Sequence, residues 1–219
     1  VGLFSRKVDV ARYGYDQADA PIDFVIDDEH LVIAAGKSNE IDGSSDDFYV
    51  SKVDLHGNEV WGKSLVNKIR TPKSIAKTST GYVFAGSGIQ WKDGRAIAVD
   101  NNGNQQWLDI YSSEEGLDVD GNETYSNERV RNVIEVTPEH FVVLQRSSQC
   151  TYTGPEDDWG NRPSTCPSEG IENKVKFIDH SGDTPVITAH LITQPASGKY
   201  DYFNQLLLTD TGLYAAGRY

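Results

Sequence analysis

Three oxygen-bearing side chains alternate in an acidic stretch that runs from residue 114 to residue 128. Asp118, Asp120 and Asn122 can direct their oxygens at one centre from a tight turn, which is the arrangement that calcium loops use. The spacing is not that of an EF-hand, because with Asp118 at position 1 the Gly required at position 6 is Glu123. The stretch therefore predicts either a calcium site or a solvated acidic loop, and both interpretations stay open.

A second stretch, residues 152–168, combines aromatic, basic and acidic side chains with several prolines. Rigid aromatic side chains provide contact area at a low entropic cost, and Trp and Arg are frequent at the centres of binding surfaces. We expect a binding surface here, formed by Tyr152, Trp159 and Arg162. The alternative is a stabilised loop whose Trp folds back onto its own sheet.

The only two cysteines, Cys150 and Cys166, flank this second stretch, and we predict that they form a disulfide. Closing a loop of about 15 residues would stabilise the fold by roughly 3 kcal/mol by restricting the unfolded chain. Disulfides persist in oxidising compartments, so we expect an extracellular or cell-surface location, with the periplasm as another option. The alternatives are two reduced thiols or a zinc site, and the stretch holds no His or third Cys to support the latter.

The sequence contains no residue set that identifies a reaction. There is no Gly-x-Ser-x-Gly elbow, and the five histidines fall mostly in expected turns without paired metal spacing, so we expect them to face solvent. The 33 acidic residues allow many pairs that could hydrolyse a glycoside, but their separation in space is not visible in sequence. We expect a protein that is not an enzyme and that uses no cofactor other than calcium.

The charge balance narrows the partners. Lys and Arg total 20 against 33 Asp and Glu, for a net charge of -13, and such a surface repels the phosphate backbones of DNA and RNA. No window approaches the roughly 18 apolar residues of a membrane helix. The chain begins at Val1 and contains no Met, so we expect a processed chain or a segment of a longer one.

The elements that position these residues are repeated. Residues 53–61 recur as residues 99–107, and Asp54 and Asp100 give the period, 100 minus 54, or 46 residues. A weaker third copy spans residues 178–186. Each copy has an apolar strand, a polar turn with Gly where positive φ is cheapest, and a second strand, which predicts a β-hairpin.

Upstream of each hairpin lies a pair of apolar strands joined by a turn, at residues 24–36, 75–86, 133–144 and 206–217. Two strands and a hairpin make four strands in about 45 residues, which is the usual length of a propeller blade. The small Ala-Gly pairs suit inner strands, and Trp61 and Trp107 suit the packing of an outer strand.

The pattern of residues 45–54, 57–61 and 80–86 resembles the repeats of secreted and cell-surface bacterial propellers of the quinoprotein-like (PQQ-like) superfamily. The resemblance runs from about Phe24 to Gly217. It implies an all-β propeller used as a surface, adhesive or scaffolding module. Only some branches of that superfamily bind pyrroloquinoline quinone, and this sequence lacks their adjacent cysteines and any recognisable cofactor-binding set.

The strand count predicts a single propeller domain or segment with three complete blades of four antiparallel strands. The complete blades lie at roughly 15–70, 71–112 and 128–193, the partial ones at 1–14 and 202–219, and the disulfide-closed insertion at 150–166. Joining the two ends would make a shared blade of only three strands, so we favour a piece of a larger propeller over a closed ring of four.

We expect a non-enzymatic extracellular propeller that mediates protein or polysaccharide binding, adhesion or assembly. Open strand edges and apolar faces at its ends would favour association with further blades or another subunit. The alternatives are a propeller enzyme acting on polysaccharide, as a glycosidase or lyase, and a structural subunit of a larger surface complex or filament.

Overall fold

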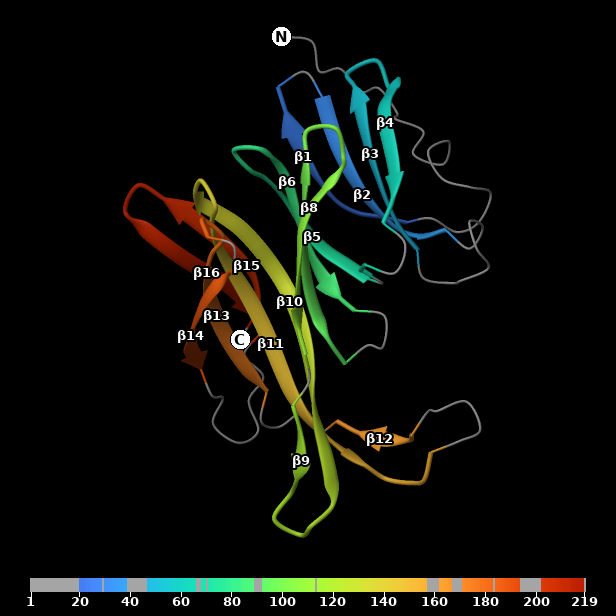
Figure 1. Ribbon diagram of the computed structural model, residues 1–219, viewed down its shortest axis with the longest axis vertical. Helices are drawn as coiled ribbons and strands as arrows, with labels where there is room; N and C mark the ends of the chain where they lie inside the picture. Colours follow the sequence, from blue (N-terminus) through green and yellow to red (C-terminus); the bar gives the residue numbers. More distant parts are fainter. Residues whose placement is uncertain are drawn as a thin grey trace.

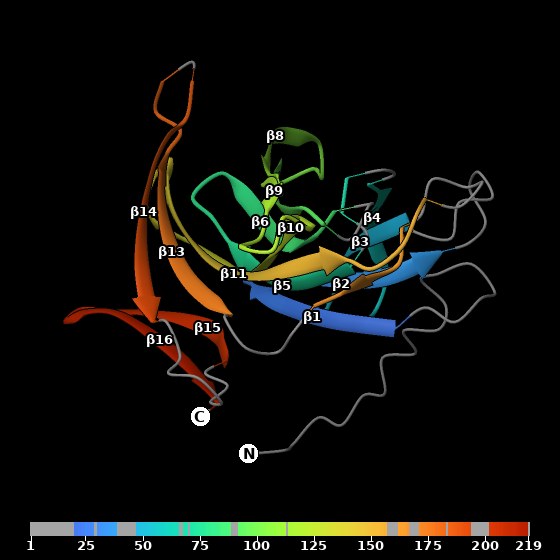
Figure 2. The ribbon, with the colours of Figure 1, turned by 90° about the horizontal axis from the view of Figure 1, so that it is seen from below.

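The computed structural model describes residues 20–28, 30–38, 47–65, 68–69, 71–88, 92–112, 114–156, 162–166, 171–182, 184–193 and 202–218 (Figures 1 and 2). Within these ranges the structure contains sixteen β-strands and no helix. The all-β class predicted from the sequence is therefore confirmed. The predicted partial blade at residues 1–14 lies outside the described residues.

The first two sheets each have four antiparallel strands joined in sequence order. The first contains β1 (Ala20–Asp27), β2 (His30–Ser38), β3 (Asp47–Asp54) and β4 (Glu59–Ser64). The second contains β5 (Thr71–Lys77), β6 (Gly81–Ser87), β7 (Gly94–Asp100) and β8 (Gln105–Tyr111).

The third sheet repeats the pattern with longer strands. It contains β10 (Glu123–Thr137), β11 (His140–Tyr152), β13 (Glu172–Asp179) and β14 (Val186–Thr193), with β9 (Glu115–Leu117) on the edge of β10 and β12 (Ser164–Thr165) paired with β11. The last sheet is the pair β15 (Tyr202–Thr209) and β16 (Gly212–Arg218). This pair matches the two strands predicted after residue 202.

The first two hairpin turns form as the repeat predicts, whereas in the third copy β13 and β14 pair but Gly182 does not have a positive φ. In the turn between β3 and β4, Asp54 Oδ1 accepts hydrogen bonds from the amides of His56 and Asn58, both at 2.8 Å. Gly57 has a φ of 84°, which a side chain would strain. The turn between β7 and β8 repeats these bonds on Asp100 and has a φ of 78° at Gly103.

The sheets pack on one another through their first strands, as β1 contacts β5, β5 contacts β10, and β10 contacts β15. An apolar core fills each of the three junctions. The described ranges follow an open curve and do not form a closed ring (Figure 2).

Each first strand carries a β-bulge at the same place, and the extra residues are Ile22, Lys73, Arg131 and Asn204. The polar residue after the bulge reaches the backbone of the next first strand in two junctions. Asp23 Oδ2 accepts the amide of Ile75 at 3.0 Å, and Asn132 Oδ1 accepts the amide of Leu206 at 3.2 Å. These bonds set the stagger of neighbouring sheets.

The two repeated tryptophans lie on the fourth strands and join each sheet to the hairpin turn of the next. Trp61 Nε1 donates to the carbonyl of Asn101 at 2.9 Å. Trp107 stacks on His180, with ring centroids 4.3 Å apart. His180 also lies 2.9 Å from the buried carboxylate of Asp109, so the expectation that the histidines face solvent was wrong for this one.

Candidate functional site

The packing between sheets repeats position by position along the first strands. The residue two positions after the extra residue of each bulge packs against the preceding sheet. These residues are Ile75, Val133 and Leu206. The residue three positions after the extra residue packs against the following sheet. These residues are Val25, Ala76 and Ile134. Each junction is therefore built from two complementary halves.

At the two ends of the curve the same positions are exposed. Phe24 is the counterpart of Ile75 and is 59% exposed, and Ile26 beyond it on the same side of β1 is 66% exposed. Leu207 is the counterpart of Ala76 and is 56% exposed, and its cross-strand partner Tyr214 is 52% exposed. We name the surface around Phe24 and Ile26 the leading face and the surface around Leu207 and Tyr214 the trailing face.

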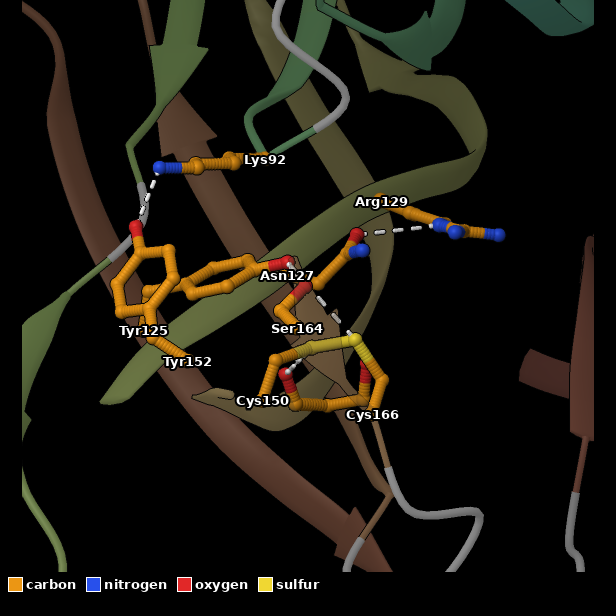
Figure 3. The surroundings of a disulfide bond; sticks show 9 residues. Lys92, Tyr125, Asn127, Arg129, Cys150, Tyr152, Ser164 and Cys166 are labelled. Carbon is orange, nitrogen blue, oxygen red and sulfur yellow. Dashed lines mark hydrogen bonds between the residues drawn. A yellow bond between two sulfur atoms is a disulfide. The ribbon is translucent and has the colours of Figure 1, made fainter. Parts of the chain in front are cut away.

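The third sheet extends beyond the others as an arm, which consists of described residues 114–127, 148–156 and 162–166 (Figure 1). The sequence predicted that the third blade starts at residue 128, but β10 already begins at Glu123 and pairs with β11 as far as Thr151. The predicted disulfide is confirmed, as Cys150 on β11 is bonded to Cys166 just after β12 (Figure 3). Of the two sets of residues singled out by the sequence, Asp118, Asp120, Asn122, Tyr152 and Arg162 lie on this arm.

Aromatic and basic side chains stack at the root of the disulfide loop (Figure 3). The rings of Tyr125 and Tyr152 are 4.8 Å apart, and Lys92 Nζ lies 4.7 and 5.0 Å from their centroids. Lys92 Nζ donates to the Tyr152 hydroxyl at 2.5 Å, and this bond raises the pKa of Lys92. The guanidinium of Arg162 lies 4.0 Å from the centre of the Tyr152 ring and pairs with Glu123.

The structure thus brings together two of the three residues predicted as a binding surface. Tyr152 and Arg162 are in contact, whereas Trp159 lies outside the described residues. Because Arg162 and Tyr125 both contact Tyr152, the stack joins the loop to the strands of the arm, which is a scaffolding use of these side chains. A binding role for the three stays a prediction.

The predicted calcium residues form a hairpin turn between β9 and β10. Asp118 Oδ1 accepts the amides of Asp120 at 2.9 Å and Asn122 at 2.8 Å, and the Asn122 side chain donates to Asp118 Oδ2 at 2.9 Å. The Asn122 bonds lower the pKa of Asp118. Gly121 has a φ of 82°, so Asp118, Gly121 and Asn122 reproduce the turns at Asp54 and Asp100.

This turn is visible in the sequence as a third Asp-x-x-Gly-Asn motif, after those at Asp54 and Asp100. Its hydrogen bonds engage the side chains of Asp118 and Asn122 and the backbone amide of Asp120. Over the described ranges, no group of three or more His, Cys, Asp and Glu side chains is placed to hold a metal ion. Calcium binding at this turn stays a prediction.

A polar cleft that the sequence did not indicate opens between the first and second sheets, with a volume of about 690 Å³. At its base the buried carboxylate of Asp27 accepts hydrogen bonds from Lys52 at 2.8 Å and from Tyr82, and it also pairs with Lys77. The hydrogen bonds from Lys52, then Lys77 and Tyr82, hold the pKa of Asp27 well below its usual range. Burial, with the bond to Asp27, raises the pKa of Tyr82 to about 12.

The Asp27 cluster joins the two sheets by charge rather than by apolar contact. Its carboxylate is ionised and fully engaged, so it is a fixed anion and a poor proton acceptor. One signal was present in the sequence, because Asp27 and Lys77 end apolar first strands, but contact between residues 50 positions apart depends on how the sheets pack.

Comparison with known protein families and with curated proteins finds no match to this chain. None of the described segments forms the long apolar helix that crosses a membrane.

Proposed function

We propose that the chain is a run of β-propeller blades that serves as a non-enzymatic extracellular module for binding and assembly. The observation that supports this proposal is the pair of half-junctions at its ends. The leading and trailing faces expose apolar residues whose counterparts pack inside the three internal junctions. The partner that fits either face is another sheet of the same kind.

Three features favour propeller blades over an unrelated stack of sheets. Each first strand contacts the first strand of the next sheet. The strands within each sheet are antiparallel and adjacent in sequence order. The fourth-strand tryptophans contact the hairpin turn of the next sheet. All three recur at successive junctions, as expected for blades around an axis. The resemblance to secreted surface propellers points the same way.

The disulfide supports the extracellular part of the proposal. The Cys150–Cys166 bond is consistent with a location outside the reducing cytoplasm. A large negative net charge suits a protein that stays soluble while exposing apolar faces to a partner.

The two faces are complementary halves of one junction, so a second copy should bind head to tail, trailing face on leading face. Burying a half-exposed large apolar side chain contributes roughly 1 kcal/mol, and the two faces together offer four such side chains. Sedimentation velocity over a range of protein concentrations measures this association.

The test uses two variants that each block one face, Phe24→Lys and Leu207→Lys. The wild-type chain should form oligomers as its concentration rises, and neither variant should associate with itself, because each has lost one half of the junction. An equimolar mixture of the two should form dimers, since each supplies the face that the other lacks. Val119→Lys, at the fully exposed tip of the β9–β10 turn, is the matched control and should associate like the wild type.

Two outcomes would contradict the proposal. One is a wild-type chain that stays monomeric at concentrations up to about 1 mM, the range in which weak association is detected. The other is a mixture of Phe24→Lys and Leu207→Lys that does not dimerise although the wild type does. That second result would place the contact elsewhere than on the two faces.

A further inference from the structure

The polar cleft between the first and second sheets is lined by residues from three turns. The β1–β2 turn contributes Asp28, the β5–β6 turn contributes Thr78 and Ser79, and the β7–β8 turn contributes Asn101. The cleft volume of about 690 Å³ lies within the range of small-molecule sites, roughly 300–1,000 Å³. All the lining residues that the structure describes are polar or charged, so the cleft suits a polar ligand and not an apolar one.

The charges that line the cleft cancel and are held by one another. The carboxylates of Asp27 and Asp28 face the ammonium groups of Lys52 and Lys77 in equal number. Lys52 Nζ donates to Asp27 and to the Tyr82 hydroxyl, both at 2.8 Å, and Lys77 pairs with the same Asp27 carboxylate. The cleft therefore offers no net charge to attract an ion, and a neutral ligand fits it better.

Three side chains of the cleft keep hydrogen-bonding capacity for a ligand. The Asp28 side chain is 90% exposed and lies 3.9 Å from Lys77, beyond the length of a hydrogen bond. The side chains of His30 and Asn101 make no hydrogen bond within the part of the chain that the structure describes. A carboxylate accepts hydrogen bonds, whereas an imidazole and an amide both donate and accept them. The cleft thus presents donors and acceptors from both sheets.

The repeat shows why the cleft lies at this junction. Asn101 and His180 occupy equivalent positions, since each follows the first Asp of a hairpin turn and each contacts the fourth-strand Trp of the preceding sheet. Where the second sheet meets the third, the His180 ring stacks on Trp107 with centroids 4.3 Å apart. Where the first meets the second, Trp61 binds only the backbone carbonyl of Asn101. The ring that fills this position at the later junction is absent here, and Asn101 lines the cleft instead.

We propose that this cleft binds a neutral saccharide, whose hydroxyl groups are held by Asp28, His30 and Asn101. Each sugar hydroxyl is both a donor and an acceptor, and two neighbouring hydroxyls can donate to the two oxygens of one carboxylate. A few such polar groups fix the orientation of a ligand in its site. The proposal does not rest on assembly, since the cleft lies at an internal junction and not on the leading or trailing face.

The test is isothermal titration calorimetry of the whole chain with three neutral probes, cellotriose, maltotriose and the trimer of N-acetylglucosamine. We expect at least one of them to bind. Asn101→His introduces the residue that the next junction already accommodates, and it should weaken that binding by at least about tenfold because the ring fills the cleft. Asn102→His adds the same ring to the same turn at a residue that does not line the cleft, and it should stay within about twofold of the wild type. Asp28→Asn, which replaces an accepting oxygen by a donor, should also weaken binding by about tenfold.

Several results would overturn the proposal. These are no heat of binding with any of the three probes at about 10 mM, binding by Asn101→His that equals that of the wild type, and an equal loss in Asn102→His. Tighter binding of trigalacturonate, which is anionic, than of every neutral probe would overturn the choice of a neutral ligand. Phe24→Lys, which blocks assembly, should bind the saccharide like the wild type, so a failure of this site and a failure of the assembly proposal can be told apart.

Discussion

Replacing Asp27 by Asn tests whether charge holds the first sheet to the second. The substitution keeps the shape of the side chain and removes the anion that pairs with Lys52 and Lys77. Lys52 is only 12% exposed at its side chain, so it would stay largely covered without its counter-ion. Leaving such a charge unpaired is strongly unfavourable.

The size of the effect follows from the position of the cluster. Breaking a fully buried pair costs roughly 3–5 kcal/mol, whereas an exposed pair contributes less than about 1 kcal/mol. The Asp27 and Lys52 side chains are about nine-tenths covered, but they border an open cleft that water enters. We therefore expect Asp27→Asn to lower the free energy of unfolding by about 2 kcal/mol.

The assay is urea denaturation at neutral pH, with Asp28→Asn as the matched control. Asp28 is the next residue, its side chain is 90% exposed, and it lies 3.9 Å from Lys77. It should leave the midpoint of the transition unchanged. Equal effects of the two substitutions would refute the view that the buried anion joins the sheets.

The pH dependence offers an independent check on the same cluster. The pKa of Asp27 is lowered in the folded protein, so the carboxylate contributes stability that is present above the unfolded pKa, near 4, and lost as pH falls toward the folded value. The wild type should therefore lose stability below about pH 4 more steeply than Asp27→Asn does. Parallel curves for the two proteins would mean that the carboxylate is not held in its charged form by the fold.

Two further predictions concern the disulfide and the hairpin turns. Cys150→Ser together with Cys166→Ser should lower the free energy of unfolding by roughly 3 kcal/mol, measured by urea denaturation, and thiol labelling of the unfolded wild type should find no free cysteine unless a reductant is added. Gly103→Ala should destabilise more than Gly121→Ala, because both glycines have positive φ but only at Gly103 would the new carbon lie about 3.0 Å from the Trp61 ring. Equal losses of melting temperature would show that Trp61 does not pack on this turn in solution.

The hairpins could be predicted because their cause is local. An Asp that accepts amide bonds within four residues and a Gly with positive φ are both properties of a short sequence, and Asp54 and Gly57 reveal them without any partner. The same rule applies to Asp118, which the sequence analysis interpreted instead through its oxygens. To recognise this turn in the sequence, Gly121 and Asn122 must be considered together with Asp118.

The junctions could not be predicted because their cause is distant. The bond from Asp23 to the amide of Ile75 spans 52 residues, and that from Asn132 to the amide of Leu206 spans 74. Neither pair stands out in sequence, since each depends on a bulge that moves one residue out of register. Phe24 is likewise exposed because none of the described sheets packs against its side of β1, and this is not visible in the sequence around it.

The bulge positions show which part of the repeated scaffold can vary. Apolar positions next to each bulge are kept from sheet to sheet because every junction needs them, whereas the extra residue of the bulge takes no part in the three cores. It is therefore free to vary, and it is Ile22, Lys73, Arg131 and Asn204 in turn. Only the junction of the second and third sheets sets two basic extra residues side by side. The packing rule therefore constrains the apolar positions and leaves the bulge positions open to change.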